Sequence, residues 1–390
     1  MTVFVLPHAI TIKGEKPLSR LGIEEYNPRE MNMEKRTTHI GKYYTSLESM
    51  KRRMEKSYRS EGFFGPYSIA SHEKWREKAS SLLSSLLGLD IIRKGAGDLS
   101  FNERKGETVM LADGIRREHI YIDVEEGVTM PLYILHPTAE PKGTIICYAG
   151  HNGAGKESVA GDDSSSAVRE KIEKYGYDYG LFSARLGYTA VCPDPRGFGE
   201  RREKAMEGDE EEKFLRSSCK ELANMAIGLG FSLMGLLVWD SMRLVDYIKS
   251  REDLSSSSLI ALGFSGGGMQ ALYSSALDNR IDKTIISGYF YGFEDSLLEM
   301  NSNCQCNYVP GVFSAFDMGD IASLIAPRPL AIQAAKGDHL EGKRGMENVM
   351  EQMEIVNRVY AIYGKKVYLD TPEGDHAFHK ENLKKILSCL

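Results

Sequence analysis

Short apolar runs that favour β-structure alternate with helical stretches from about residue 117 to the end of the chain. Strands that are apolar at nearly every position are typical of a parallel sheet with helices on both faces. The first run, residues 117–137, is instead predicted to be a β-hairpin, because Ile120, Ile122 and Val124 alternate with other residues before a Glu-Gly turn. The later runs are GTIICYAG, YTAVCPD, LIALGF, KTIISGY, PLAIQAA and KVYLDT. The sequence therefore predicts an α/β fold whose eight-stranded, mostly parallel sheet is flanked by helices.

The first hundred residues are rich in charge and in helix formers. In residues 72–90 the apolar residues recur at helical spacing, but few apolar residues precede Trp75. We therefore predict that residues 1–110 are an N-terminal helical extension packed on the core, and that residues 111–390 form the main domain. The same helices are the predicted surface for any self-association into a homo-oligomer.

The charge and hydropathy of the chain exclude several classes of partner. The formal net charge is −6, so no global basic field would hold nucleic acid or anionic lipid. No run of about 18 apolar residues indicates a membrane span. The N-terminal apolar stretch lacks a basic leader and is interrupted by Pro7 and His8, which is not typical of a signal peptide. We expect a cytoplasmic protein that binds neither nucleic acid nor membrane.

The six cysteines give no sign of a metal site or a disulfide framework in the sequence. They lie at positions 147, 192, 219, 304, 306 and 389. Cys147 and Cys192 fall within apolar strand-like runs, where cysteine acts as a small hydrophobe. Cys304 and Cys306 are closer together than ordinary metal-ligand pairs, and no second Cys/His pair stands at finger spacing. A reduced protein without metal or cofactor is the simplest interpretation.

The strongest chemical motif is Gly-x-Ser-x-Gly at residues 263–267, between the strand LIALGF and a predicted helix. A serine at so sharp a strand-to-helix turn needs glycines on either side, because side chains there would collide with the strand and the helix. The turn also puts Ser265 at a helix N-terminus, which favours developing negative charge. The alternative interpretation is a glycine-rich turn that binds phosphate. No P-loop or dinucleotide fingerprint accompanies it, so we predict that Ser265 is a nucleophile.

A nucleophile on this strand requires an acid and then a histidine further along the chain. His376 follows the last predicted strand and is the predicted general base, whereas His379 lies three residues later on the closing helix. Asp338 follows the preceding strand and is the predicted acid, which would hold His376 in the correct tautomer. The alternatives for the acid are Glu294 and Asp295, and Asp375 is disfavoured because sequence neighbours rarely face each other.

A tetrahedral intermediate of acyl transfer needs two N–H donors. The amide of Gly266, directly after the nucleophile, is the first predicted donor. The second should come from the glycine-rich loop after the strand GTIICYAG, where we assign it to His151, with Asn152 as the neighbouring alternative. Either side chain could instead brace the loop.

Several motifs together resemble the acetyl xylan esterase-like, or dienelactone hydrolase-like, branch of the α/β-hydrolases. They are AGHNGAGKES, CPDPRGFGERR, GLLVWDSMRLVDYIKSRED, GFSGGGMQ, CNYVPG and DIASLIAPRPL. The resemblance covers roughly residues 75–390, and it implies the α/β-hydrolase fold, no cofactor, and hydrolysis of small esters, often acetyl groups on sugars. By position, Ser265, Asp338 and His376 match the family triad, and His151 matches the oxyanion-loop residue. The usual His-Gly at the start of that loop is Ala-Gly here.

Two further features concern the predicted substrate pocket. Arg196 either faces the pocket or, as we favour, forms a buried ion pair with Glu200 or Asp240. The segment 289–326 is predicted to be a lid or a pocket wall, with ordinary hydrophobic packing as the alternative. Its aromatic residues Tyr289, Tyr291 and Tyr308 are candidates for substrate contact, as is Arg196.

The sequence thus predicts a serine hydrolase that cleaves small carboxylic esters through a Ser-His-Asp triad and an acyl-enzyme. One alternative is a peptidase of the prolyl-oligopeptidase type, although the first 110 residues are too few for its large propeller. Another is a non-catalytic α/β-hydrolase that acts as a scaffold or binding protein. The intact serine, acid and histidine in the required order favour the enzyme.

Overall fold

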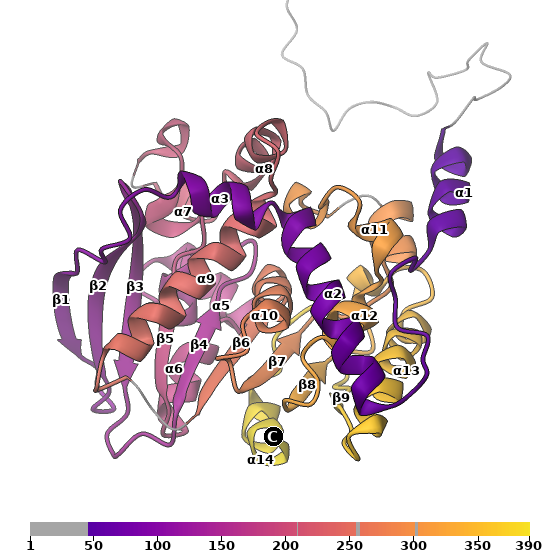
Figure 1. Cartoon of the computed structure of the whole chain (residues 1–390). Helices are drawn as coiled ribbons and strands as arrows, with labels where there is room; N and C mark the ends of the chain where they lie inside the picture. The colour runs from indigo at the N-terminus through magenta and orange to yellow at the C-terminus, as the bar shows by residue number, and fades with distance from the viewer. Residues whose placement is uncertain (1–45, 209, 255–257, 301–302) are drawn as a thin grey trace, which may run out of the picture. The chain divides into compact units, whose positions relative to one another are not determined.

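The computed structural model describes residues 46–208, 210–254, 258–300 and 303–390 (Figure 1). Within this part, Leu47–Leu390 forms one compact unit. Expectations that concern residues 1–45, including the N-terminal apolar stretch, lie outside the described residues.

A single nine-stranded sheet organises this unit. In sequence the strands are β1 Arg104–Met110, β2 Arg116–Glu125, β3 Val128–His136, β4 Thr144–Tyr148, β5 Thr189–Pro193, β6 Leu259–Phe264, β7 Lys283–Ser287, β8 Leu330–Gln333 and β9 Tyr368–Asp370. Their order across the sheet is β1-β2-β3-β5-β4-β6-β7-β8-β9. The predicted hairpin is the antiparallel pair β2 and β3, and the six predicted later strands are β4 to β9. The predicted strand plan is therefore confirmed, with one strand added at its edge.

The added strand β1 lies in the segment assigned from the sequence to the helical extension. It pairs antiparallel with β2 at the sheet edge. Nearly all of its residues are exposed, so the strand carries no alternating apolar pattern that sequence inspection could detect.

Strands β4 to β9 run parallel to one another, and their carboxyl ends lie at one edge of the sheet. The register aligns Tyr148 at the end of β4 with Gly263 near the end of β6. It also aligns Gln333 at the end of β8 with Asp370 at the end of β9. The loops that carry the predicted site residues therefore leave the sheet on the same side, as expected for an open α/β sheet.

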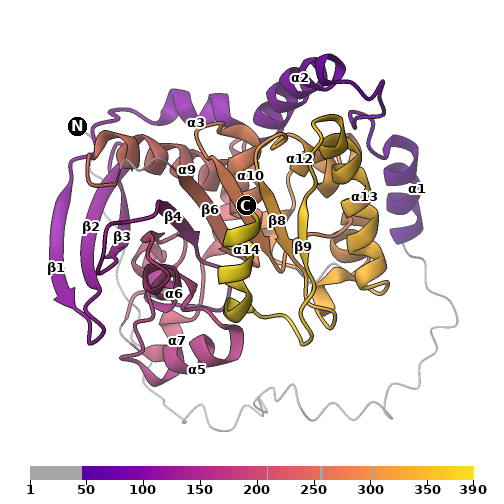
Figure 2. The same cartoon turned by 90° about the horizontal axis from the view of Figure 1, so that it is seen from below.

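Helices cover both faces of the sheet (Figure 2). They are α1 Leu47–Ser57, α2 Ile69–Leu87, α3 Leu89–Gly95, α4 Lys156–Val159, α5 Ser166–Tyr175, α6 Tyr179–Arg185, α7 Glu211–Phe214, α8 Cys219–Gly228, α9 Leu233–Ser250, α10 Gly266–Leu277, α11 Val312–Ala315, α12 Met318–Ser323, α13 Met346–Ile362 and α14 Leu383–Cys389. In β4, Ile145 packs with residues of α6 and α14, while Ile146 packs with residues of α9 and α10. This alternation explains why the strand is apolar at every position.

The helices α1 and α2 pack on the core through buried polar contacts as well as apolar ones. Following α1, Arg59 donates two hydrogen bonds of 2.7 Å to Asp320. In α2, the His72 ring contacts the Tyr363 hydroxyl at 2.8 Å and the Ser323 carbonyl at 3.2 Å. Residues 47–95 are thus continuous with the large hydrophobic core that includes α9, α10, α12 and α13.

No single helix within the described ranges is long and apolar enough to cross a membrane. By length and composition alone, the pair α8 and α9, bent by 100°, would pass that test together.

The packing of α2 predicts a stability difference between two leucine truncations. Leu83 in α2 is fully buried in the main core, whereas Leu229, just after α8, is 66% exposed. We expect Leu83→Ala to lower the free energy of unfolding by about 2–5 kcal/mol, because it leaves a cavity, and Leu229→Ala to change it by less than about 0.5 kcal/mol. Denaturant unfolding of both variants measures this. Equal effects would contradict the assignment of α2 to the core.

Candidate active site

Ser265 lies at the turn between β6 and α10, in a backbone conformation rare for a residue with a side chain. Its φ is 55° and its ψ is −121°. The turn is held because the Ser265 amide donates to the Ser287 carbonyl of β7 at 2.8 Å, and the Met269 amide of α10 donates to the Ser265 carbonyl at 3.0 Å. A strained serine between a strand and a helix is the geometry of an exposed nucleophile.

The glycines of the motif are required by close backbone contacts. A Cβ atom on Gly263 would lie 2.0 Å from the Gly267 carbonyl oxygen, and one on Gly267 would lie 1.9 Å from the Tyr148 carbonyl oxygen at the end of β4. These distances are far below van der Waals contact. The first turn of α10 therefore packs directly against the ends of β4 and β6 only because both positions lack side chains.

His376 and Asp338 are paired. The Nδ1 atom of His376, on the loop after β9, lies 2.7 Å from Oδ2 of Asp338, on the loop after β8. The other carboxylate oxygen of Asp338 accepts a hydrogen bond of 2.9 Å from the Leu340 amide. The His376 ring packs on Phe264, the residue before Ser265, with ring centroids 4.6 Å apart. The imidazole is thus held on one side by a buried carboxylate and on its face by an aromatic ring.

The alternative acids and base lie elsewhere. Asp295 pairs with Arg344 at 2.8 Å, and Glu294 begins a π-helix, Glu294–Glu299. The backbone amide of His379 donates to Gln333 at 3.0 Å, and its ring contacts Glu381 at 3.3 Å.

Two tyrosine hydroxyls hold the end of β4 and the following loop in place. Tyr179 donates to the Tyr148 carbonyl at 2.5 Å, and Tyr177 donates a short hydrogen bond to the His151 carbonyl. Asn152 has a φ of 62°, so the chain turns sharply after His151. Beyond the turn, the Ala154 amide donates to Ser158 at 2.9 Å.

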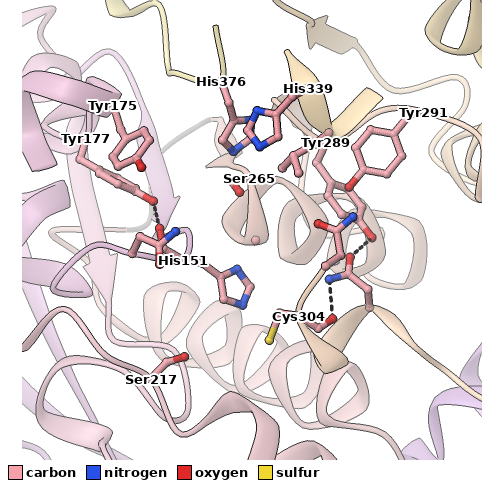
Figure 3. Close-up of a pocket in the computed structure, with 15 residues that line it drawn as sticks. His151, Tyr175, Tyr177, Ser217, Ser265, Tyr289, Tyr291, Cys304, His339 and His376 are labelled. Atoms are coloured by element: carbon pink, nitrogen blue, oxygen red, sulfur yellow. Dashed lines mark hydrogen bonds between the residues drawn. The ribbon is translucent and has the colours of Figure 1, made fainter. Parts of the chain in front are cut away.

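A cavity of about 590 Å³ opens beside Ser265 (Figure 3). It is lined by His151, Asn152, Tyr175, Tyr177, Ser217, Ser265, Gly266, Tyr289, Tyr291, Asn303, Cys304, Asn307, His339, Leu340 and His376. The predicted nucleophile, base and oxyanion-loop residues therefore share one cavity, with Asp338 directly behind His376.

Two of the predicted pocket residues do not line this cavity. Arg196 forms a buried ion pair with Asp240, at 2.7 Å, and with Glu125, so of its two predicted partners Asp240 is correct and Glu200 is wrong. Tyr308 donates instead to the Leu297 carbonyl at 2.9 Å. Both side chains brace neighbouring segments of the fold.

Several cavity residues were missed in the sequence. Tyr175 is the last residue of α5, Tyr177 lies two residues later, and Ser217 precedes α8, and the sequences around them show no catalytic motif. His339 directly follows Asp338, and its ring lies 5.8 Å from that of His376. The position of His339 next to the predicted acid was the one signal that could have placed it here.

Strong pKa shifts are found at Glu341, near Asp338, and at His151, in the cavity wall. Burial, and then the nearby charge of Asp338, raises the pKa of Glu341 to about 8. Burial lowers the pKa of His151, but hydrogen bonds with Cys219 and Cys304 outweigh it and raise this pKa to about 10. Glu341 is thus protonated at neutral pH. The raised pKa of His151 shows that the neighbouring cysteine sulfur atoms interact with its imidazole.

Comparison with known proteins identifies the class. Residues 41–365 match the model of the Abhydrolase family, so the chain belongs to this family of α/β-hydrolases. The predicted family and fold are confirmed. A relative from Bacillus subtilis (strain 168), named "Putative hydrolase YtaP", is 30% identical over 245 residues, which are 61% of this chain and 75% of that protein.

Two solved structures share the fold. One, titled as a putative acetyl xylan esterase from Bacteroides fragilis NCTC 9343, has a TM-score of 0.66 and 18% identity, covering 90% of this chain and 87% of that one. The other, a glucuronoyl esterase from Solibacter usitatus, has a TM-score of 0.56 and 15% identity, covering 80% and 91% of the two chains. At this identity the likeness concerns the fold.

The turn geometry predicts contrasting outcomes for two glycine substitutions. Gly267→Ala places a methyl group against the Tyr148 carbonyl, so we expect it to lower the free energy of unfolding by at least about 2 kcal/mol. Gly95→Ala, at the end of α3, meets no atom within 4 Å and should be neutral or slightly stabilising. Denaturant unfolding of both variants checks this. A Gly267→Ala protein as stable as Gly95→Ala would disprove the proposed packing.

Proposed function

We propose that the protein is a serine ester hydrolase in which Ser265 is the nucleophile, His376 the general base and Asp338 the residue that orients it. The observation that carries the proposal is the pairing of His376 with Asp338 at 2.7 Å in the cavity that Ser265 and His376 share. The conformation of Ser265 at the N-terminus of α10 supports the same role, because it places the serine at the cavity beside the amides of the first helical turn.

The tautomer of His376 follows from its partner. Asp338 accepts the Nδ1 proton, so Nε2 is free to accept the Ser265 proton as the hydroxyl oxygen attacks the ester carbonyl. The amide of Gly266 and an amide of the His151 loop donate to the oxyanion. The C–O bond then breaks as His376 returns the proton to the leaving alcohol. Water, deprotonated by His376, releases the acid from the acyl-enzyme and restores Ser265.

The cavity favours a small acyl group joined to a polar alcohol. Its volume of about 590 Å³ lies in the range of small-molecule sites. Tyrosine and asparagine residues line it, and such side chains can form hydrogen bonds with a hydroxylated alcohol such as a sugar. The names of the two structural neighbours, a putative acetyl xylan esterase and a glucuronoyl esterase, agree with this class. We therefore propose acetyl esters of carbohydrates as the substrate class.

The nucleophile is tested by hydrolysis of p-nitrophenyl acetate, butyrate and octanoate. We expect activity on the short chains that falls at least about a hundredfold in Ser265→Ala, because the acyl-enzyme cannot form. The control is Ser275→Ala, which removes a buried hydroxyl from the same helix and should keep activity within about threefold. Equal activity in wild type and Ser265→Ala, or none in wild type, would contradict the proposal.

The acid is tested by Asp338→Asn at pH 7. An amide in place of the carboxylate favours the wrong His376 tautomer, and we expect kcat to fall about 10²–10⁴-fold. Glu341→Gln is the matched control. Because the pKa of Glu341 is raised to about 8, the side chain is already neutral at pH 7, so glutamine should leave kcat within about threefold. A larger loss in Glu341→Gln than in Asp338→Asn would show that the acid is misassigned.

A further inference from the structure

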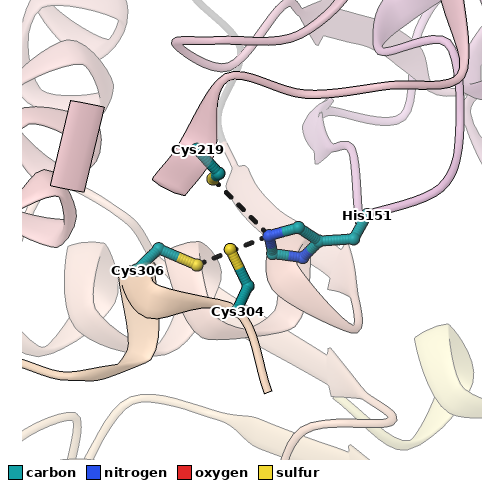
Figure 4. Close-up of side chains that lie close together, drawn as sticks. All are labelled: His151, Cys219, Cys304 and Cys306. Atoms are coloured by element: carbon teal, nitrogen blue, oxygen red, sulfur yellow. Dashed lines mark hydrogen bonds between the residues drawn. The ribbon is translucent and has the colours of Figure 1, made fainter. Parts of the chain in front are cut away.

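Four potential metal ligands from three separate segments meet beside the cavity (Figure 4). His151 belongs to the loop after β4, Cys219 is the first residue of α8, and Cys304 and Cys306 flank the start of a short 3₁₀ helix, Gln305–Asn307. One ligand atom from each residue lies within 4.8 Å of each of the others. Cys304 and Cys306 have no second Cys/His pair at finger spacing in the sequence, and the residues that the fold brings next to them lie 85 or more positions away in the chain.

The spacing of these atoms matches a tetrahedral zinc site. Zinc bonds of about 2.3 Å to sulfur and about 2.0–2.1 Å to histidine nitrogen, at tetrahedral angles, separate the sulfur and nitrogen ligands by about 3.5 Å. In the structure, Nε2 of His151 lies 3.6 Å from the sulfur of Cys219 and 3.4 Å from that of Cys306. These two separations are those expected of ligands on one zinc ion, and the remaining ligand atoms lie within 4.8 Å of one another.

The surroundings of the cluster are also typical of a metal site. Cys219 and Cys306 are buried, and the Asn307 side-chain amide donates to the sulfur of Cys306 at 3.7 Å and to the Cys304 carbonyl at 2.9 Å. The oxygen of the same Asn307 side chain accepts from Tyr289 at 2.8 Å. Hydrogen bonds to ligating sulfur, themselves fixed by a further partner, orient the ligands before the metal binds.

We propose that His151, Cys219, Cys304 and Cys306 bind one Zn²⁺ ion in a tetrahedral Cys₃His site. The ion forms bonds to His151 Nε2 and to three thiolates, and every proton that these four ligand atoms carried passes to solvent without any redox change. Four protein ligands leave no open coordination position, so the ion is structural and does not activate water.

The site joins the segments that form the cavity. The bound ion would connect the loop that carries His151 to α8 and to the segment that carries Tyr289 and Asn307. The opposite nitrogen of the imidazole, Nδ1, lies against Gly266, where a Cβ atom would come within 2.4 Å of it. Zinc on Nε2 would leave the ring proton on Nδ1, and would fix both the tautomer and the position of the ring beside the proposed oxyanion hole.

The test measures metal content, which does not depend on the proposed esterase activity. The full-length protein is reduced with a non-chelating phosphine, incubated with Zn²⁺, desalted and analysed by elemental mass spectrometry. We expect about one zinc per chain in wild type and in the control Cys389→Ser, whose cysteine is exposed near the C-terminus. Cys304→Ser and Cys306→Ser should each retain less than about 0.2 zinc per chain.

Wild type alone also tests the site, in case the variants fail to fold. Co²⁺ should bind in place of zinc and give the intense visible and near-ultraviolet absorption of tetrahedral cobalt with thiolate ligands, and added Zn²⁺ should abolish it. A wild-type protein that retains less than about 0.2 zinc and gives no such spectrum would overturn the proposal. So would a disulfide between any two of the three cysteines in the freshly isolated protein.

Discussion

The site depends on the direct contact between the first turn of α10 and the ends of two strands. Gly263 and Gly267 approach carbonyl oxygens so closely that no Cβ atom would fit at either position. This contact holds the residue between them, Ser265, in a strained backbone conformation with a φ of 55°. The same contact keeps the N-terminal amides of α10 at the cavity, where they are available to an anion.

The rest of the proposed machinery is assembled by the parallel sheet. Since β4, β6, β8 and β9 end at the same edge, the loops that carry His151, Ser265, Asp338 and His376 start close together even though 225 positions separate the first from the last. Each loop is then held by its own contacts. Tyr177 and Tyr179 fix the β4 loop, and Phe264 and Asp338 fix the imidazole of His376.

The proposed zinc site and the cavity share residues, so the two are mechanically connected. His151 and Cys304 belong to both, and Asn307 links Tyr289 of the cavity to the sulfur of Cys306. A metal ion at this place would stiffen a wall made of irregular segments, whose short 3₁₀ and π-helical turns make few regular backbone hydrogen bonds. This gives a physical reason for a metal-binding cluster next to a site built mostly from loops.

The sequence by itself determined the sheet from β2 to β9, the turn at Ser265 and the positions of Asp338 and His376. These features follow from local patterns: apolar runs, glycines at fixed offsets, and polar residues directly after strands. Tertiary structure alone decided which side chains enclose the cavity, as Tyr175, Tyr177 and Ser217 show. It also decided that Arg196 faces Asp240 and Glu125, and that β1, which has no apolar pattern, joins the sheet. The Cys₃His cluster is the clearest case, because its members come together only when three distant segments pack. The spacing of these residues along the chain does not indicate this contact.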